Sequence, residues 1–408
     1  MAQNLRWLYL GRALRSFVTS FLTVIFPLYL AQSGYGAPRI GLALALSGVM
    51  TLALVAAVGP IGDRLGRRRV IIALSALAVA GGAAMATSTA FAVVVLASGL
   101  GGVGRGGGAG SGGSWGPVFP AEQPLMAAAV RPEERTAAFG LLSFIGVIAG
   151  AVGSLVAAVP AILVAGGMGW LAAYRVLFWA GAALAVAMLA VALPLREERT
   201  PVERETDQTP PTLSFRQLLG RLALTNGLNG LGFGFLGPML TYWFYRRYGV
   251  GPAEIGVLYT VINLASAMPY LGSSRLTAYL GSAVRTVTLT RAAGLLAMVT
   301  MVFMPSFWWA GAAYTVRMML NSLGMPARQS YVMGVAAERY RSRIAAYSSL
   351  PSQAGAIVSP AVGGALMDSV IDIPIFGAVF FMSLNVVAYY LAFRNVHPEG
   401  EAGQTPGA

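Results

Sequence analysis

Several residue types that carry enzyme chemistry are absent or nearly absent from this chain of 408 residues. It has no cysteine, which excludes a disulfide framework, a thiolate metal site and a cysteine nucleophile. The single histidine, His397, lies in the polar carboxyl-terminal segment, which argues against a histidine proton relay and a histidine-based metal site. The sequence therefore predicts that the protein is not an enzyme and needs no metal or other cofactor.

Charged residues are also scarce, at 11% of the chain, whereas 56% of the residues are hydrophobic. Soluble domains carry about a quarter charged residues, so this composition and a mean hydropathy of +0.68 predict a membrane protein. The net charge of +13 does not indicate a nucleic-acid partner, because the arginines punctuate apolar segments instead of clustering on one soluble face. The lipid bilayer is the expected partner.

Long apolar segments predict twelve transmembrane helices, since one crossing needs roughly 20 mostly apolar residues. The predicted spans are 14–31, 39–61, 70–88, 91–115, 137–160, 171–195, 219–245, 254–274, 285–304, 307–327, 344–367 and 374–394. Residues 1–195 and 218–394 would each form a six-helix bundle, residues 196–217 a charged cytoplasmic linker, and residues 395–408 a polar cytoplasmic tail. The predicted fold class is an all-α membrane protein with two six-helix pseudo-repeats.

The arginines are distributed unequally between alternate loops. If the amino terminus is inside, 21 arginines face the cytoplasm and 4 face the opposite side. Cytoplasmic loops carry such an excess, so we predict a multi-pass protein of the cell membrane with both termini in the cytoplasm. The first apolar segment lacks an Ala-x-Ala exit and runs into a second span, so we expect it to remain as the first helix.

Short similarities indicate an internal repeat. Residues 36–41, Gly-Ala-Pro-Arg-Ile-Gly, recur 215 residues later at 251–256 as Gly-Pro-Ala-Glu-Ile-Gly, and residues 135–139 resemble residues 343–347. Two parallel repeats would place a substrate site near the bilayer midplane between them. Chance similarity among glycine-rich and alanine-rich helices is the alternative.

The most specific motif lies between the second and third spans and reads Gly59-Pro-Ile-Gly-Asp63-Arg64-Leu-Gly66-Arg67-Arg-Arg. It resembles the signature loop of the major facilitator superfamily, Gly-x-x-x-Asp-Arg-x-Gly-Arg-Arg/Lys-x, at every fixed position. The resemblance implies a gate-stabilising latch formed by Asp63, Arg64 and Arg67, with the two flanking glycines permitting close approach and a tight turn. A basic loop that only sets topology is the alternative.

Two further segments resemble motifs of the same superfamily. Arg105 in the fourth span precedes Arg135 by thirty residues, similar to the spacing between the family's membrane-embedded arginine and its next cytoplasmic loop. In the fifth span, Gly146 and Gly150 match part of the antiporter motif Gly-x-x-x-Gly-Pro-x-x-Gly-Gly, with Ala151 in place of its proline. The resemblance implies gating roles for the arginine and the two glycines, and simple packing of small residues is the alternative.

Polar residues inside the spans bear on the substrate, since a charge at mid-bilayer costs about 3 kcal/mol and usually faces a cavity or a partner. Arg105 and Arg317 are the mid-span cations, and no Asp or Glu lies at comparable depth. We infer an electropositive cavity for an anionic or amphipathic solute. The predicted substrate-binding residues are Arg105, Arg317, Asn229, Asn263, Asn321, Gln353, Thr23 and Tyr242. The alternative is that both arginines only bond freed backbone carbonyls and stabilise helix packing.

The resemblance to the superfamily implies a secondary transporter that works by alternating access, with proton-linked efflux of drug-like or metabolite molecules as the expected activity. The arginine pair and the missing buried acid favour an alternative, an uptake or exchange carrier for an organic anion. A non-transporting membrane sensor is a further alternative of a different class, against which stands the lack of a soluble signalling domain. The expected partners are a small-molecule substrate and protons or a counter-ion, and a monomer suffices.

Overall fold

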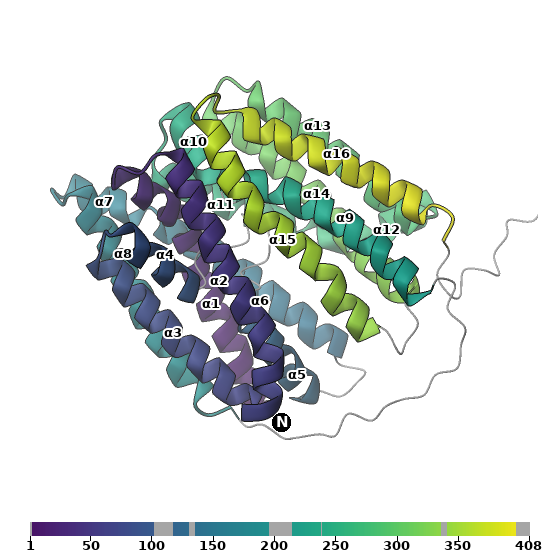
Figure 1. The fold of residues 1–408 in the computed structure, drawn as a ribbon, viewed down its shortest axis with the longest axis horizontal. Helices are drawn as coiled ribbons and strands as arrows, with labels where there is room; N and C mark the ends of the chain where they lie inside the picture. The colour runs from purple at the N-terminus through teal and green to yellow at the C-terminus, as the bar shows by residue number, and fades with distance from the viewer. Residues whose placement is uncertain are drawn as a thin grey trace, which may run out of the picture. The chain divides into compact units, whose positions relative to one another are not determined.

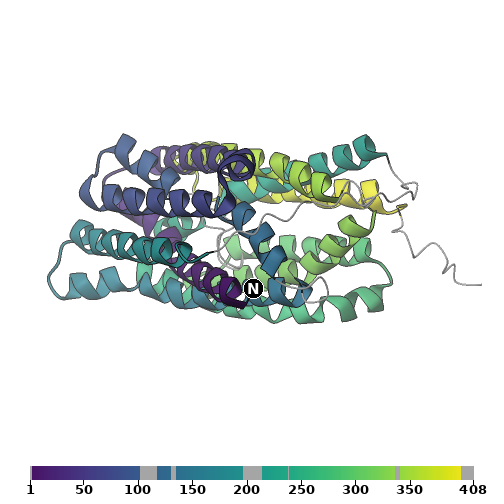
Figure 2. The same cartoon turned by 90° about the horizontal axis from the view of Figure 1, so that it is seen from below.

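The computed structural model describes residues 2–101, 117–129, 135–195, 214–237, 239–335 and 341–396. Within these ranges the chain forms helices joined by short loops, and no strand occurs (Figures 1 and 2). Arg105, residues 196–213 of the predicted linker and His397 lie outside the described residues, as does the side chain of Asp63. The predicted all-helical fold class is thus confirmed.

Most helices of the first half correspond to predicted spans, whereas the helix at Phe119–Ala129 lies in the loop predicted between spans 91–115 and 137–160. The helices of this half are α1 (Ala2–Gln32), α2 (Ala37–Leu65), α3 (Arg67–Thr87), α4 (Phe91–Leu100), α5 (Phe119–Ala129), α6 (Arg135–Val156), α7 (Val159–Ala165) and α8 (Trp170–Ala192). Gly66 separates α2 from α3 with a φ of 97°, a left-handed conformation that favours glycine. The tight turn predicted at this position is therefore present. Helix α1 begins twelve residues before the predicted span, because the amphipathic segment with Arg6, Arg12 and Arg15 is also helical.

The helices of the second half are more often interrupted. They are α9 (Phe215–Leu236), α10 (Leu240–Tyr248), α11 (Pro252–Ala267), α12 (Pro269–Leu280), α13 (Ala283–Val302), α14 (Phe307–Val335), α15 (Arg341–Met367) and α16 (Ile373–Phe393). The predicted span 219–245 is divided into α9 and α10, and the span 254–274 into α11 and α12. Helix α12 begins at Pro269, whose missing N–H favours the first turn of a new helix over the interior of an old one.

Six segments of the described chain are helical, long enough and apolar enough to cross a membrane, and α11 with α12 would make a seventh if the bent pair is one span. The six are 4–32, 37–58, 67–87, 141–165, 170–192 and 373–393. Five of them belong to the first half. Helices α13 and α14 are long enough but carry arginines and other polar residues, which lower their hydropathy and point to a polar interior in the second half.

The chain divides into two compact units. Unit 1 consists of residues 1–200, 236–264 and 360–374, and unit 2 of residues 201–235, 265–359 and 375–408. Unit 1 therefore adds α10, most of α11 and the end of α15 to the helices of the first half. The two six-helix bundles expected from the sequence stay a prediction.

In unit 1, α1 packs against α6 and α8, and α3 packs against α8. Small residues bring backbones together, since a Cβ on Gly153 of α6 would lie 2.8 Å from the Cα of Phe17. The same unit joins segments that are far apart in the sequence. A Cβ on Gly256 of α11 would lie 2.5 Å from the carbonyl oxygen of Ser154, and the hydroxyl of Thr260 donates a 2.9 Å hydrogen bond to the carbonyl of Ala151.

In unit 2, α13 and α14 form the most extensive helix pair. A Cβ on Gly234 of α9 would lie 2.8 Å from the Cα of Ala356 in α15, so these two backbones are also in close contact. At one end of the unit, a cluster of buried apolar side chains includes Leu222, Val287, Tyr331 and Phe393. The helices α9, α13, α14, α15 and α16 thus surround a common interior.

Candidate functional site

The interior of unit 2 contains a cavity of about 320 Å³ between α9, α13, α14, α15 and α16, which we call the arginine cavity. Its polar lining residues are Asn229, Thr290, Arg291, Arg317, Asn321, Arg328, Ser352 and Asn385. Its other lining residues are Phe233, Gly294, Leu295, Met318, Met325, Met382 and Val386. Three cations therefore face one cavity, and no Asp or Glu is among the described residues that line it.

Helix α14 contributes one continuous stripe to this cavity. Arg317, Asn321, Met325 and Arg328 are spaced at intervals of four, four and three residues, which places them on the same face of a helix. Arg317 is buried, with 9% of its surface exposed. Gly294 on α13 lies beside it, because a Cβ there would be 3.8 Å from the Cγ of Arg317. The glycine makes room for the stem of the arginine.

Arg291 is held by a side chain of α16. Its guanidinium donates a 2.6 Å hydrogen bond to the Oδ1 of Asn385 and lies 5.7 Å from the centre of the Tyr389 ring. The amide nitrogen of Asn385 in turn donates to the backbone carbonyl of Thr225 in α9. Arg291, Asn385 and this carbonyl thus form a relay across three helices that fixes the direction of the arginine.

Arg328 is held by a second relay of the same kind. Its guanidinium donates to the Oδ1 of Asn226 in α9, and the amide nitrogen of Asn226 donates a 2.6 Å hydrogen bond to the carbonyl of Ser348 in α15. The Nε of Arg328 is buried and has no hydrogen-bond partner among the described residues. In both relays the arginine is paired with a neutral amide, so among the described residues these partners do not compensate its positive charge.

Arg317 differs from the other two arginines in its partners. Its two terminal nitrogens each lie 3.3 Å from a sulfur atom, one of Met318 and one of Met382, and its guanidinium lies 5.3 Å from the centre of the Tyr314 ring. A thioether is a weak acceptor, and apart from the Tyr314 hydroxyl the donors of Arg317 have no oxygen acceptor in the described part of the chain. This arginine is the one most available to a ligand.

The structure brings together three of the predicted substrate-binding residues, namely Arg317, Asn229 and Asn321. Gln353 follows the lining residue Ser352 but does not itself line the cavity. The other described candidates lie in unit 1, where Asn263 and Tyr242 are buried and Thr23 donates a hydrogen bond to its own helix. Arg105 lies outside the described residues.

Sequence reasoning missed Arg291, Arg328, Asn226 and Asn385. Arg291 is not among the mid-span cations predicted from the sequence, yet its guanidinium is bonded inside the unit to Asn385. Arg328 was counted as a loop residue because the predicted span ends at 327, whereas α14 continues to Val335. The two asparagines carry no periodic signal, and only the packing of the helices shows which arginine each one contacts.

The predicted gating residues are only partly described. Gly150 of α6 faces α1, since a Cβ there would lie 2.9 Å from the Oγ of Ser20, and Gly146 is buried in the same helix. In the loop between α2 and α3, Arg64 is exposed and Arg67 is half-buried. Their latch role stays a prediction.

Arg68, in the same loop region, connects α3 to α8. The guanidinium of Arg68 donates a 2.5 Å hydrogen bond to the carbonyl of Leu193 at the carboxyl end of α8. The loop that follows α2 is thus attached to α8 through Arg68, which stands at the Arg/Lys position of the motif.

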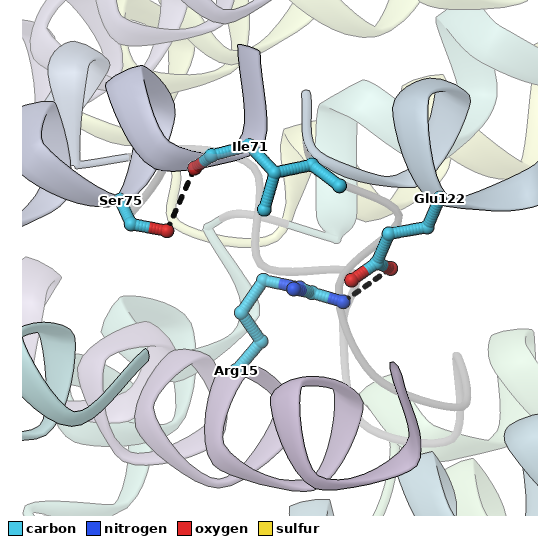
Figure 3. Close-up of polar contacts among 4 residues, drawn as sticks. All are labelled: Arg15, Ile71, Ser75 and Glu122. Atoms are coloured by element: carbon cyan, nitrogen blue, oxygen red, sulfur yellow. Dashed lines mark hydrogen bonds and ion pairs between the residues drawn. The ribbon is translucent and has the colours of Figure 1, made fainter. Parts of the chain in front are cut away.

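A separate group of buried charges lies in unit 1 (Figure 3). A guanidinium nitrogen of Arg15 lies 2.5 Å from a carboxylate oxygen of Glu122, in the first turn of α5, and nearby Ser75 donates to the carbonyl of Ile71. Glu122 and Arg12 are 3% and 1% exposed. Glu122 is buried although it lies in the first turn of a helix, so an acidic side chain does occur in the interior of unit 1. Arg15 also borders a pocket of about 70 Å³.

Known proteins with the same architecture are transporters. The family profile described as "Major Facilitator Superfamily" matches residues 8–224. A bacterial homologue of the human lysosomal transporter Spinster, in an inward-facing and unoccupied conformation, matches with a TM-score of 0.72 and 14% identity over 96% of this chain and 97% of that one.

Two further solved structures match with a TM-score of 0.67. One is a bacterial metal transporter, with 14% identity over 95% of this chain and 98% of that one. The other is the nucleoside transporter NupG, with 13% identity over 97% of this chain and 99% of that one. No curated protein matches the sequence. At these identities the solved structures indicate the fold and not the solute.

Proposed function

The chain belongs to the Major Facilitator Superfamily and is a membrane transporter rather than an enzyme, and we propose that it carries a small organic anion by alternating access. The observation that supports this proposal is the arginine cavity, in which Arg291, Arg317 and Arg328 face one interior space without a carboxylate among the described lining residues. Three uncompensated charges in a region of low dielectric repel one another, so an anion that enters the cavity relieves this repulsion.

The hydrogen-bonding groups of the cavity also favour an oxyanion. The Nε of Arg328 and the amides of Asn229 and Asn321 are donors without a hydrogen-bond partner among the described residues, and Arg317 has only Tyr314 and two thioethers as partners there. The amide oxygens of Asn226 and Asn385 are already taken by arginines. A cavity rich in free donors and poor in free acceptors binds carboxylate or phosphate oxygens in preference to cations.

The apolar part of the lining adds a second requirement. Phe233, Leu295 and three methionines form the remaining walls, and methionine adapts to ligands of irregular shape. The solute is therefore a small organic anion with an apolar portion rather than an inorganic ion. A volume of about 320 Å³ is at the small end of the range for metabolite sites.

The experiment that tests this function is uptake of a panel of labelled organic anions and cationic dyes into proteoliposomes, with and without a pH gradient. The wild type is compared with Arg317→Ala and with Arg285→Ala, a matched control because Arg285 lies exposed at the start of α13. We expect anion uptake that is lost in Arg317→Ala and kept in Arg285→Ala. Transport of cationic dyes only, unaffected by Arg317→Ala, would refute the proposal.

Proton-linked efflux of drug-like or metabolite molecules is the second candidate function. The observation that favours it is the buried Arg15–Glu122 ion pair, since charged residues buried within a membrane protein often mark an ion or proton pathway. In this case Glu122→Gln should abolish the dependence of transport on the pH gradient while solute binding is kept. A Glu122→Gln protein with unchanged proton dependence would exclude Glu122 from the coupling.

A further inference from the structure

The positions of the three arginines along the helix axes bear on the shape of the solute. Gly294 faces Arg317, and Gly324 faces Thr290, because a Cβ on Gly324 would lie 2.5 Å from the Oγ1 of Thr290. Helices α13 and α14 therefore run antiparallel in a fixed register. In this register Arg291, next to Thr290, lies at a level between Arg317 and Arg328.

The hydrogen-bond partners of Arg291 and Arg328 show where the two guanidiniums lie. Arg328 ends at Asn226, and Arg291 ends at Asn385, which contacts the carbonyl of the adjacent Thr225. The charged ends of Arg291 and Arg328 thus meet at one turn of α9. Their charges also interact directly. We call this pair of guanidiniums the double-arginine end of the cavity.

The charged end of Arg317 lies farther along the same helix. It contacts Met382, and Met382 packs against Gly232 of α9, where a Cβ would lie 2.5 Å from the Cγ of the methionine. Gly232 follows Asn226 by six residues, so the two cationic ends are separated by roughly 9 Å along α9, at 1.5 Å per residue. Asn229 lies midway between them, and the lining residues beside it include Phe233 and Leu295.

From this arrangement we propose that the cavity selects an elongated dianion, one anionic group bound by Arg317 and the other by the double-arginine end formed by Arg291 and Arg328. The inference rests on the proposed anion transport and specifies its substrate class. A monoanion would neutralise one end only and leave the other end charged and without a negative counter-charge. A dianion with both charges on one group would have the same defect. A chain of a few methylene groups between two carboxylates satisfies both ends and places its apolar part against the methionines.

The test measures binding to the full-length protein in detergent at neutral pH, by calorimetry and thermal shift, for ligands that separate charge number from charge spacing. The ligands are adipate, malonate, hexanoate and glycerol phosphate. We expect adipate to bind about tenfold or more tightly than hexanoate, since the second end adds a charge-assisted contact. Glycerol phosphate carries its charges on one group, so it should bind more weakly than adipate, whereas malonate has two separate carboxylates and should bind more tightly than glycerol phosphate.

Variants make the assignment specific. In Arg317→Ala one end is missing, so adipate and hexanoate should bind about equally, whereas Arg317→Lys should keep part of the preference because it keeps the charge. Arg285→Ala should not change the preference. If hexanoate or glycerol phosphate binds the wild type as tightly as adipate, the dianion inference is overturned and anion transport stands. If none of the four ligands binds, while the dyes of the transport assay do, the proposed function itself fails.

Discussion

Gly41 in α2 and Gly364 in α15 lie against each other within unit 1, since a Cβ on Gly41 would come within 3.1 Å of the Cα of Gly364. The same Cβ would overlap the carbonyl oxygen of Pro360. Glycine is thus required on both sides of this helix crossing, which joins the second predicted span to the eleventh. A larger residue must push the helices apart.

Substitution of Gly41 by alanine should therefore destabilise the protein by roughly 1–3 kcal/mol, the usual cost of overpacking. The control is Gly220→Ala in α9, where a Cβ would meet no atom within 4 Å. Thermal unfolding in detergent should show a lower apparent Tm for Gly41→Ala only. Equal stability of the two variants would show that the crossing can open at no cost.

Replacement of Asn385 by aspartate should separate folding from anion binding. The carboxylate can still accept the hydrogen bond from Arg291, but it adds a negative charge to the arginine cavity. The variant loses the donor to the carbonyl of Thr225 but gains an ion pair with Arg291, so we expect its apparent Tm to lie above that of Asn385→Ala and its anion affinity to fall about tenfold or more, as expected for the loss of one charge-assisted contact. Asn385→Ala is the comparison, and it should lower the Tm because Arg291 loses its acceptor. Unchanged anion affinity in Asn385→Asp would contradict the electrostatic explanation.

Asp372 connects the segment between α15 and α16 to α10. Its carboxylate accepts a 2.9 Å hydrogen bond from the indole nitrogen of Trp243 and lies 3.3 Å from the guanidinium of Arg247. Asp372→Asn keeps an acceptor for Trp243 and loses the ion pair, whereas Asp372→Ala loses both. Because Trp243 is buried, we expect the alanine variant to lose about 1–3 kcal/mol and the asparagine variant less. A Tm series in the opposite order would refute this assignment.

Arg68 should stabilise the protein through the carboxyl end of α8. Its hydrogen bond to the carbonyl of Leu193 satisfies a group that the helix leaves free, so Arg68→Ala should cost roughly 0.3–1 kcal/mol. Arg64→Ala is the matched control, because Arg64 is an exposed arginine of the same turn region. The difference in Tm between the two variants should be smaller at high salt than at low salt. If the two variants have the same Tm at low salt, Arg68 does not cap α8.

The all-helical membrane fold could be predicted because long apolar segments and the loop around Gly66 are local properties of the sequence. Arg317 could be predicted as a cavity residue for the same reason, since it interrupts an apolar span. Arg328 and Glu122 could not, because the structure extends α14 beyond the apolar run and begins α5 inside unit 1. To recognise either residue as buried, one must know where its helix ends, and not only where the apolar segment of the sequence ends.

The relays could not be predicted from the sequence for a different reason. Asn226 and Asn385 are ordinary polar residues of their own helices, and their function depends on which helix lies next to which. Helix neighbours are a property of the packed unit and leave no mark on a single segment. The glycine contacts between α2 and α15 have the same origin.

The two relays end on consecutive residues of one helix, the carbonyl of Thr225 and the side chain of Asn226. Both arginines of the double-arginine end are therefore connected to the same turn of helix α9. If a bound solute displaces the side chain of Arg291 or of Arg328, the change in hydrogen bonding reaches this turn in either case. A single fluorescent or spin label on the outer face of that turn, at exposed Leu224, would report occupancy of the cavity from outside it.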